Sequence, residues 1–158
     1  MLRKIILAIL TLSVLSADGI LAAPKKPPRE VFGLRIGMSE ESVHRRLRRI
    51  ATQQKEEKSE EEEGEQEVWI LKGDARFNYL LTRFNREHRL VLITVVAHPN
   101  RVRYADVASI KEATVATDGS NYSYKWKVEG RGQRKGSLYI ARGSSPEFLT
   151  SYSLYLVR

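Results

Sequence analysis

The sequence of 158 residues predicts an α+β fold, in which an antiparallel β-sheet carries helices on one face and the elements follow the order α-βββ-α-βββ. Two observations support this prediction. Apolar residues recur at helical spacing in two separate segments, and each segment precedes three runs of strand-like pattern. Turn residues such as Gly, Asp and Asn separate these runs by short connections, which are typical of neighbouring antiparallel strands.

The N-terminal stretch, residues 1–23, has the features of a secretory signal peptide. Arg3 and Lys4 precede an apolar run, and small residues follow where a peptidase would cut, either after Gly19 or after Ala23. An uncleaved membrane anchor is the alternative, but the apolar run is shorter than the roughly 20 residues that span a bilayer. Because no later segment is apolar enough to cross a membrane, we expect no transmembrane span after signal removal.

The rest of the chain divides into a linker and one domain. Residues 24–31 are rich in proline and lysine, which predicts an extended linker. Residues 32–158 suit a single α+β domain with its own core. The sequence has no cysteine, so it offers neither disulfide bonds nor the residue that carries the lipid of a bacterial lipoprotein. We therefore expect a periplasmic or secreted protein that is not a lipoprotein.

The first helix is predicted over residues 40–51, directly after the Gly-Met-Ser turn at residues 37–39. The serine of this turn is a favourable N-cap. Val43, Leu47 and Ile50 then form one apolar stripe at helical spacing.

An acidic run follows this helix. Eight of the 19 acidic residues lie within residues 56–67. Like charges at this density repel each other, so residues 53–66 are predicted to form a disordered loop. The run lacks the ligand spacing of a calcium loop. A metal-binding or partner-binding tail, and a shield over the protein's own arginine-rich helix, are the alternatives.

Six strands are predicted in two groups of three, with a weaker helix at residues 106–114 between the groups. The predicted strands are residues 67–72, 75–84 and 89–97 in the first group, and 122–128, 137–141 and 149–157 in the second. In the second strand, Phe77, Tyr79 and Leu81 alternate with polar residues and are expected on one face. The third strand is almost wholly apolar, which favours a central place in the sheet.

A family resemblance rests on the helix start and the first three strands. The motif Gly37-Met38-Ser39-x-x-x-Val43, with Phe32 before it and Val68-Trp69 and Tyr79-x-x-x-x-Phe84 after it, resembles the SmpA/OmlA family of BamE-like outer-membrane assembly lipoproteins. The resemblance covers residues 31–97. That family shares a fold with the β-lactamase inhibitor proteins, and the repeated order of helix and strands is similar to the tandem domains of those inhibitors.

This resemblance implies a non-catalytic protein-binding module, in which Gly37, Met38, Ser39 and Val43 form a structural motif. The chain departs from the family in two respects. It lacks the cysteine to which the lipid of those lipoproteins is attached, and its acidic run replaces a short connection. The membrane tether of the family is therefore not expected here.

The candidate binding residues are cations. The formal net charge is +8 although the acidic run is included, so the remainder of the chain is strongly basic. The candidates lie on the first helix, on a strand and in a glycine-rich loop: Arg45, Arg46, Arg48, Arg49, Lys125, Lys127, Arg131, Arg134 and Lys135. A basic surface attracts anionic partners, and salt weakens the attraction.

Two kinds of partner follow from these patterns. The first is an envelope or secreted protein. The alternative is an anionic envelope surface of lipid headgroups, lipopolysaccharide or acidic polymers. Tyr122, Tyr124 and Trp126 alternate with the strand lysines and are expected to face the core rather than to stack on bases. Nucleic acid is not expected as the partner of an exported protein.

No motif for catalysis is present, and we predict no enzyme activity, cofactor or metal. His44, His88 and His98 each lack a companion at metal-ligand spacing in the sequence, although His98 is notable as the end of the apolar third strand. The loop at residues 130–136 is rich in glycine and cations. It lacks the Gly-Lys-Ser/Thr sequence and the following helix that a phosphate-binding loop needs.

Overall fold

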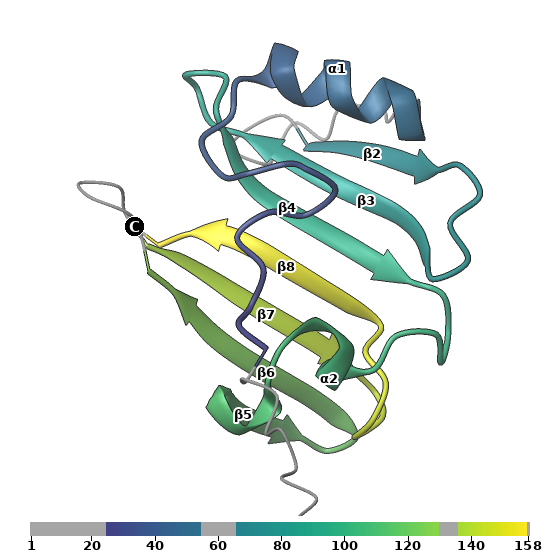
Figure 1. Cartoon of the computed structure of the whole chain (residues 1–158), viewed down its shortest axis with the longest axis vertical. Coiled ribbons are helices and arrows are strands. Elements are labelled where there is room, and N and C mark those ends of the chain that lie inside the picture. The colour runs from purple at the N-terminus through teal and green to yellow at the C-terminus, as the bar shows by residue number, and fades with distance from the viewer. Residues whose placement is uncertain (1–24, 55–65, 130–135, 158) are drawn as a thin grey trace, which may run out of the picture.

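A computed structural model describes residues 25–54, 66–129 and 136–157, whose strands form one continuous eight-stranded sheet (Figure 1). All strand pairs are antiparallel, and the order across the sheet is β1-β2-β3-β4-β8-β7-β6-β5. The elements are α1 (Glu40–Ile50), β1 (Ala51–Gln54), β2 (Gln66–Leu71), β3 (Phe77–Phe84), β4 (Leu90–Ala97), α2 (Tyr104–Val107), the 3-10 helix η1 (Ile110–Glu112), β5 (Thr114–Asp118), β6 (Asn121–Val128), β7 (Ser137–Gly143) and β8 (Ser151–Leu156).

The predicted α+β class with the order α-βββ-α-βββ is wrong. The described chain is mostly one antiparallel sheet with little helix, and each half contributes four strands rather than three. The two additional strands, β1 and β5, are the edges of the sheet. Every residue of β5 is exposed, and β1 buries only Ala51. Neither strand has the buried, alternating pattern by which strands are recognised. Because β1 includes Gln53 and Gln54, the predicted loop at residues 53–66 begins too early.

The second predicted helix, residues 106–114, is much shorter than expected. It consists of the single turn α2 and the separate 3-10 turn η1. The backbone between them is extended at Ala108, with φ −157° and ψ 165°. At the next residue, the Ser109 amide donates a hydrogen bond of 2.7 Å to the carbonyl of Lys25 rather than to a helical carbonyl. A contact from the N-terminal segment thus replaces the continuation of the helix.

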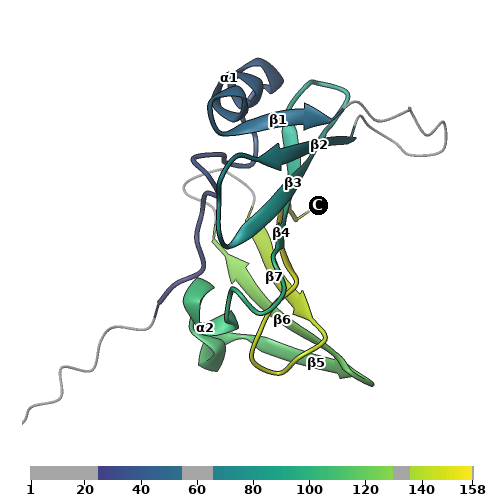
Figure 2. The ribbon, with the colours of Figure 1, turned by 90° about the vertical axis from the view of Figure 1, so that its right-hand side faces the viewer.

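The core lies on one face of the sheet. One row of paired residues on this face runs across the strands through Trp69, Leu80, Val95, Tyr152, Ala141 and Tyr124. Helix α1, the segment before it and α2 lie over this face (Figures 1 and 2). Val43 and Leu47 of α1 are fully buried against it. None of the described helices is long and apolar enough to cross a membrane.

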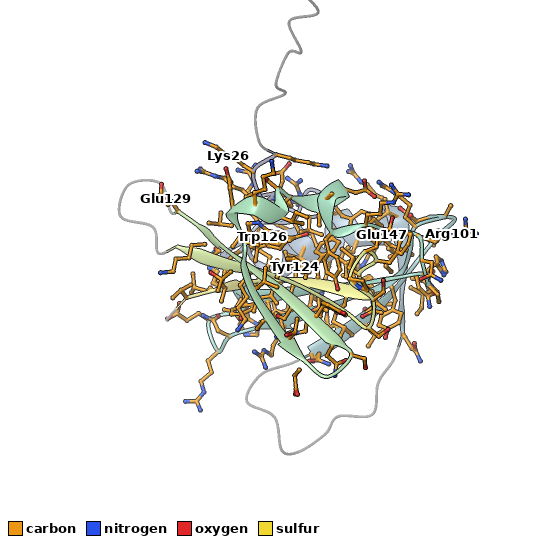
Figure 3. All side chains as sticks on the ribbon, turned by 90° about the horizontal axis from the view of Figure 1, so that it is seen from below. Lys26, Arg101, Tyr124, Trp126, Glu129 and Glu147 are labelled. Atoms are coloured by element: carbon orange, nitrogen blue, oxygen red, sulfur yellow. The ribbon has the colours of Figure 1, made fainter. Side chains whose placement is uncertain are left out.

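The aromatic residues of β6 belong to this core, as predicted. Trp126 is 3% exposed, and its indole N–H donates to the carbonyl of Ser109 over 2.9 Å. Tyr122 and Tyr124 are partly buried against the same cluster. Figure 3 shows Tyr124 and Trp126 in the interior, whereas Lys26 lies at the periphery. These rings therefore pack with the core, as the alternation predicts.

Three core tyrosines have raised pKa values. Burial, with smaller contributions from the neighbouring Tyr124 and Tyr122, raises the pKa of Tyr104 to about 12. Burial also raises the pKa of Tyr139 and that of Tyr152 far above the ordinary value of 10.0. The hydroxyls of Tyr104 and Tyr139 are buried without a hydrogen-bond partner among the described residues. Burial thus favours the protonated form of all three tyrosines in the folded chain.

The Gly-Met-Ser turn joins α1 to the strand β4. The Gly37 amide donates to the carbonyl of Leu90 over 2.7 Å, and the Leu90 amide donates to the carbonyl of Met38 over 2.9 Å. Gly37 has a φ of +87°, which favours glycine. Ser39 occupies the N-cap position as predicted, but its hydroxyl donates to the Ser42 hydroxyl and makes no bond to the helix backbone. The turn thus fixes where α1 begins chiefly through the backbone of its glycine and methionine.

Candidate binding surfaces and a histidine–carboxylate cluster

The second face of the sheet, which we term the open face, has no described helix or strand over it (Figure 2). Strand register places two opposed hydroxyls, those of Thr94 and Ser153, at its centre, where their oxygens are 2.9 Å apart. Apolar side chains surround this pair, and Ile70 is 39% exposed. The apolar residues on this face are Val68, Ile70, Tyr79, Leu81, Leu92, Val96, Leu138, Ile140 and Tyr155. Of these, Val68 and Ile140 are buried, with exposed fractions of 6% and 2%, and the others besides Ile70 are partly exposed.

One bulge determines which aromatic residues reach this face. A register shift between Phe77 and Tyr79 places Phe77 in the core and Tyr79 on the open face. The prediction that Phe77, Tyr79 and Leu81 share one face is therefore wrong. An extra residue at a bulge changes the side to which the following side chains point, and strict alternation does not reveal it.

Four of the described cations also lie on the open face. The predicted binding residues Lys125 and Lys127 pair across the strands with Ile140 and Leu138, so the register brings them to this side. Arg142 lies opposite Ser123 on β7, and Arg83 lies opposite Leu92 on β3. Sequence reasoning missed both arginines. The predicted β7 ended at residue 141, one residue too early to include Arg142.

The predicted cations do not form a single surface. Arg45, Arg46, Arg48 and Arg49 are exposed on α1, which covers the core face, whereas Lys125 and Lys127 are on the opposite side of the sheet. The remaining candidates, Arg131, Arg134 and Lys135, lie outside the described residues.

Arg46 is the only arginine of α1 that lines a shallow hollow of about 920 Å³, which we term the arginine hollow. Its guanidinium donates to the carbonyl of Gly33 over 2.8 Å. Three further arginines join it, and one of them, Arg35, lies 3.1 Å from the carboxylate of Glu30. The lining includes the cations Arg29, Arg35, Arg46 and Arg89, the acids Glu30 and Glu129, and the apolar Ile36, Met38, Leu90 and Leu156.

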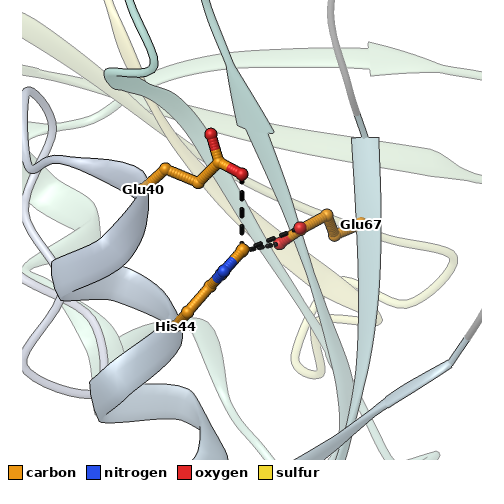
Figure 4. Close-up of side chains that lie close together, drawn as sticks. All are labelled: Glu40, His44 and Glu67. Carbon is orange, nitrogen blue, oxygen red and sulfur yellow. Dashed lines mark hydrogen bonds and ion pairs between the residues drawn. The ribbon is translucent and has the colours of Figure 1, made fainter.

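A cluster of one histidine and two glutamates lies where α1 meets β2 (Figure 4). Glu40 and His44 are one helical turn apart on α1, and Glu67 is on β2. The His44 Nε2 atom is 2.8 and 2.9 Å from the two carboxylate oxygens of Glu67, and 4.0 Å from Oε1 of Glu40. The three side chains are mostly buried, with exposed fractions of 18%, 11% and 23% for His44, Glu67 and Glu40.

Other side chains hold Glu67 in place. The indole N–H of Trp69 donates to its Oε2 over 3.0 Å, and the hydroxyl of Thr82 donates to the same oxygen over 3.2 Å. The amide of Gln53, on the edge strand β1, donates to Oε1 over 3.0 Å. Trp69 is 1% exposed and Thr82 is fully buried. Both oxygens of the Glu67 carboxylate therefore accept hydrogen bonds. Two of the donors, Trp69 and Thr82, belong to the core.

The other two members are also positioned by neighbours. The imidazole of His44 packs against the rings of Trp69 and Phe84, with centroid distances of 5.5 and 5.9 Å. Oε2 of Glu40 lies 2.6 Å from Nδ1 of His88. Sequence reasoning missed this arrangement. The i, i+4 spacing of Glu40 and His44 was not used as a signal, and Glu67 is 23 residues beyond His44, so only the fold brings it to them.

Comparison of the chain with known protein families, with curated proteins and with solved structures found no match. The resemblance to the SmpA/OmlA family therefore stays a prediction.

Proposed function

We propose that this chain is an exported, non-catalytic protein-binding module and that it binds its partner on the open face. The observation that carries the proposal is the apolar surface of this face, over which no described element lies. Contiguous exposed apolar patches on a protein are commonly interaction sites. The signal-like residues 1–23 support export, and the predicted family resemblance points to the same class of function.

The cations of the open face define the partner's chemistry. Lys125, Lys127 and Arg142 lie on the β6–β7 side and Arg83 lies on β3, with apolar residues of β4, β8 and β7 between them. A complementary partner is a protein with an apolar patch bordered by carboxylates. A second copy of this chain fits less well, because a face-to-face dimer would bring the same cations together in a chain of net charge +8.

Site-specific photocrosslinking tests this proposal. A benzophenone amino acid replaces Tyr79 or Tyr155 on the open face, and Arg48 on α1 serves as the control position. We expect one acidic envelope protein to be captured from both open-face positions and not from Arg48. The purified partner should then bind saturably, and Lys125→Glu with Lys127→Glu should weaken the affinity by about 10-fold or more, since reversed charges repel the same carboxylates.

Three results would overturn the proposal. These are equal capture from the Arg48 position, no capture in the native envelope, and an adduct only between copies of the chain. The last result would identify the open face as a homodimer interface.

A second candidate function is binding to an anionic amphiphile at a membrane or polysaccharide surface, and the arginine hollow favours it. The hollow combines cations with the partly exposed apolar side chains of Ile36 and Met38. Flotation with vesicles of phosphatidylglycerol, compared with vesicles of phosphatidylcholine alone, tests this function. We expect salt-sensitive binding that is lost in Arg46→Gln with Arg89→Gln. Arg48→Gln with Arg49→Gln removes the same charge outside the hollow and should retain binding; equal losses in the two variants would reject this function.

A further inference from the structure

We propose that Glu40, His44 and Glu67 bind a divalent transition-metal ion of the zinc class between α1 and β2. Nothing in the proposed protein-binding function requires this site, and its test is independent of the open face.

The donor set suits such an ion. One imidazole nitrogen and two carboxylates are common protein ligands of zinc, and a site with three protein ligands leaves a fourth position for water. One ligand atom from each of the three side chains can be chosen so that all three lie within 4.8 Å of one another. Helix α1 provides Glu40 and His44, one turn apart, and strand β2 provides Glu67. The fold therefore assembles the three ligands from two elements.

The two distances from His44 require only small adjustments, and the ligand oxygens of Glu40 and Glu67 lie within 4.8 Å of each other. Zinc–ligand bonds of about 2.0–2.1 Å at a tetrahedral centre place the ligand atoms roughly 3.3 Å apart. The His44 Nε2 atom is 2.8 Å from Oε1 of Glu67 and 4.0 Å from Oε1 of Glu40. The first distance must widen and the second must shorten, in each case by less than about 1 Å, which rotation of the two glutamate side chains can supply.

The surrounding residues resemble the outer shell of a metal site, in which each ligand is oriented by another group. Trp69 and Thr82 both donate to Oε2 of Glu67. Besides His44, Oε1 has one described partner, the amide of Gln53, and an exposed side chain on an edge strand is easily displaced. On the other side, His88 contacts the Glu40 oxygen that does not face His44.

Electrostatics also favour a cation at this position. An ordinary histidine–glutamate ion pair would explain the contact between His44 and Glu67, but not the presence of a second carboxylate. Here a second carboxylate, that of Glu40, converges on the same imidazole nitrogen (Figure 4). The carboxylates of Glu40 and Glu67, partly buried and with oxygens within 4.8 Å of each other, repel each other, and a divalent ion between them removes the repulsion. The rings of Trp69 and Phe84 reduce the competition of water on one side of the imidazole.

Titration of the full chain with zinc chloride by calorimetry, and with cobalt(II) by visible absorption, tests the proposal. We expect one saturable site whose affinity falls about 100-fold or more in His44→Asn, because the only nitrogen ligand is lost. His98→Asn is the matched control, since His98 lies outside the cluster, and it should bind as the unmodified chain does. The glutamates at residues 56–65, outside the cluster, would add weak binding that does not depend on His44.

A second measurement keeps the test decisive if His44→Asn does not fold. In the unmodified chain, histidine ring resonances followed by NMR during zinc addition should show the His44 signals shifting at one equivalent, with those of His98 unchanged. Zinc binding that leaves the His44 resonances in place, one-site binding whose affinity is unchanged in His44→Asn, or the absence of a saturable site would each overturn the proposal.

Discussion

At the scale of single residues, Gly143 occupies a position that excludes any side chain. A Cβ atom there would lie 2.5 Å from the carbonyl oxygen of Phe148, 2.6 Å from the Tyr104 hydroxyl and 3.1 Å from the Cα of Leu149. Two of these three atoms belong to the backbone and cannot rotate away. The end of β7 therefore packs directly on the segment that enters β8.

Gly143→Ala is expected to lower the free energy of unfolding by about 1–3 kcal/mol, because the added methyl group overpacks this contact. Urea denaturation measures the change. The neighbouring exposed Ser144→Ala serves as the control and should change stability by less than about 0.5 kcal/mol. Equal stability of the glycine variant and the unmodified chain would contradict the close approach described for Gly143.

A second prediction concerns the buried hydroxyl of Tyr139. The side chain is fully buried and its hydroxyl has no partner among the described residues. Tyr139→Phe removes the unsatisfied group and keeps the ring, so the free energy of unfolding should rise by about 1 kcal/mol. Thermal denaturation measures the change. Tyr155→Phe, at a half-buried tyrosine on the open face, is the control. A loss of stability would mean that the hydroxyl has an acceptor.

At the scale of elements, the start of α1 depends on the backbone more than on the serine cap. Ser39→Ala is expected to cost less than the approximately 1 kcal/mol of an ordinary N-cap, because its hydroxyl bonds Ser42 and not the helix backbone. Gly37→Ala should cost about 1–2 kcal/mol, since alanine resists a φ of +87°. Chemical denaturation of both variants tests this order, and a serine variant that is the less stable of the two would contradict it.

Which elements could be predicted depended on burial. The strands β2, β3, β4, β6, β7 and β8 bury residues on the core face, and their patterns located them within a few residues. The edge strands β1 and β5 are stabilised by pairing with one neighbour, which leaves almost no hydrophobic signal in their sequences. The second helix was overpredicted because Val107 and Ile110 have helical spacing although the chain between them is extended.

The sites were harder to predict than the elements, because locating each site requires the strand register or a contact between residues far apart in the sequence. The basic residues were evident from composition. Their division between α1 and the open face required the strand pairing of Lys125 and Lys127. The histidine–carboxylate cluster required β2 to bring Glu67 beneath His44. Local sequence patterns carry little information on contacts of this kind.

At the scale of the whole molecule, the buried tyrosines make the free energy of unfolding depend on pH in the alkaline range. The pKa of Tyr104 is raised to about 12, and those of Tyr139 and Tyr152 are also raised above the ordinary 10.0. The unfolded chain therefore releases these protons at lower pH than the folded chain does. Stability from this source is fully present below pH 10 and is lost as the pH rises above it.

We expect the free energy of unfolding to fall between about pH 9 and about pH 11.5, as measured by urea denaturation at several pH values. Other groups also titrate in this range, so Tyr139→Phe is the control. Its stability relative to the unmodified chain should increase with pH, because phenylalanine has no proton to release. Parallel pH profiles for the two proteins would show that Tyr139 does not contribute.

The two halves of the molecule have the same plan, a helix followed by four antiparallel strands, and meet where β4 pairs with β8. Among the described strands, this is the only pairing between strands that are not neighbours in the chain; its central residues, Thr94 and Ser153, are 59 positions apart. Local contacts form faster than those that close a long loop. We expect each meander to form early and the junction to close late in folding. Thr94→Ala and Ser153→Ala should then accelerate unfolding in stopped-flow experiments and leave the folding rate nearly unchanged.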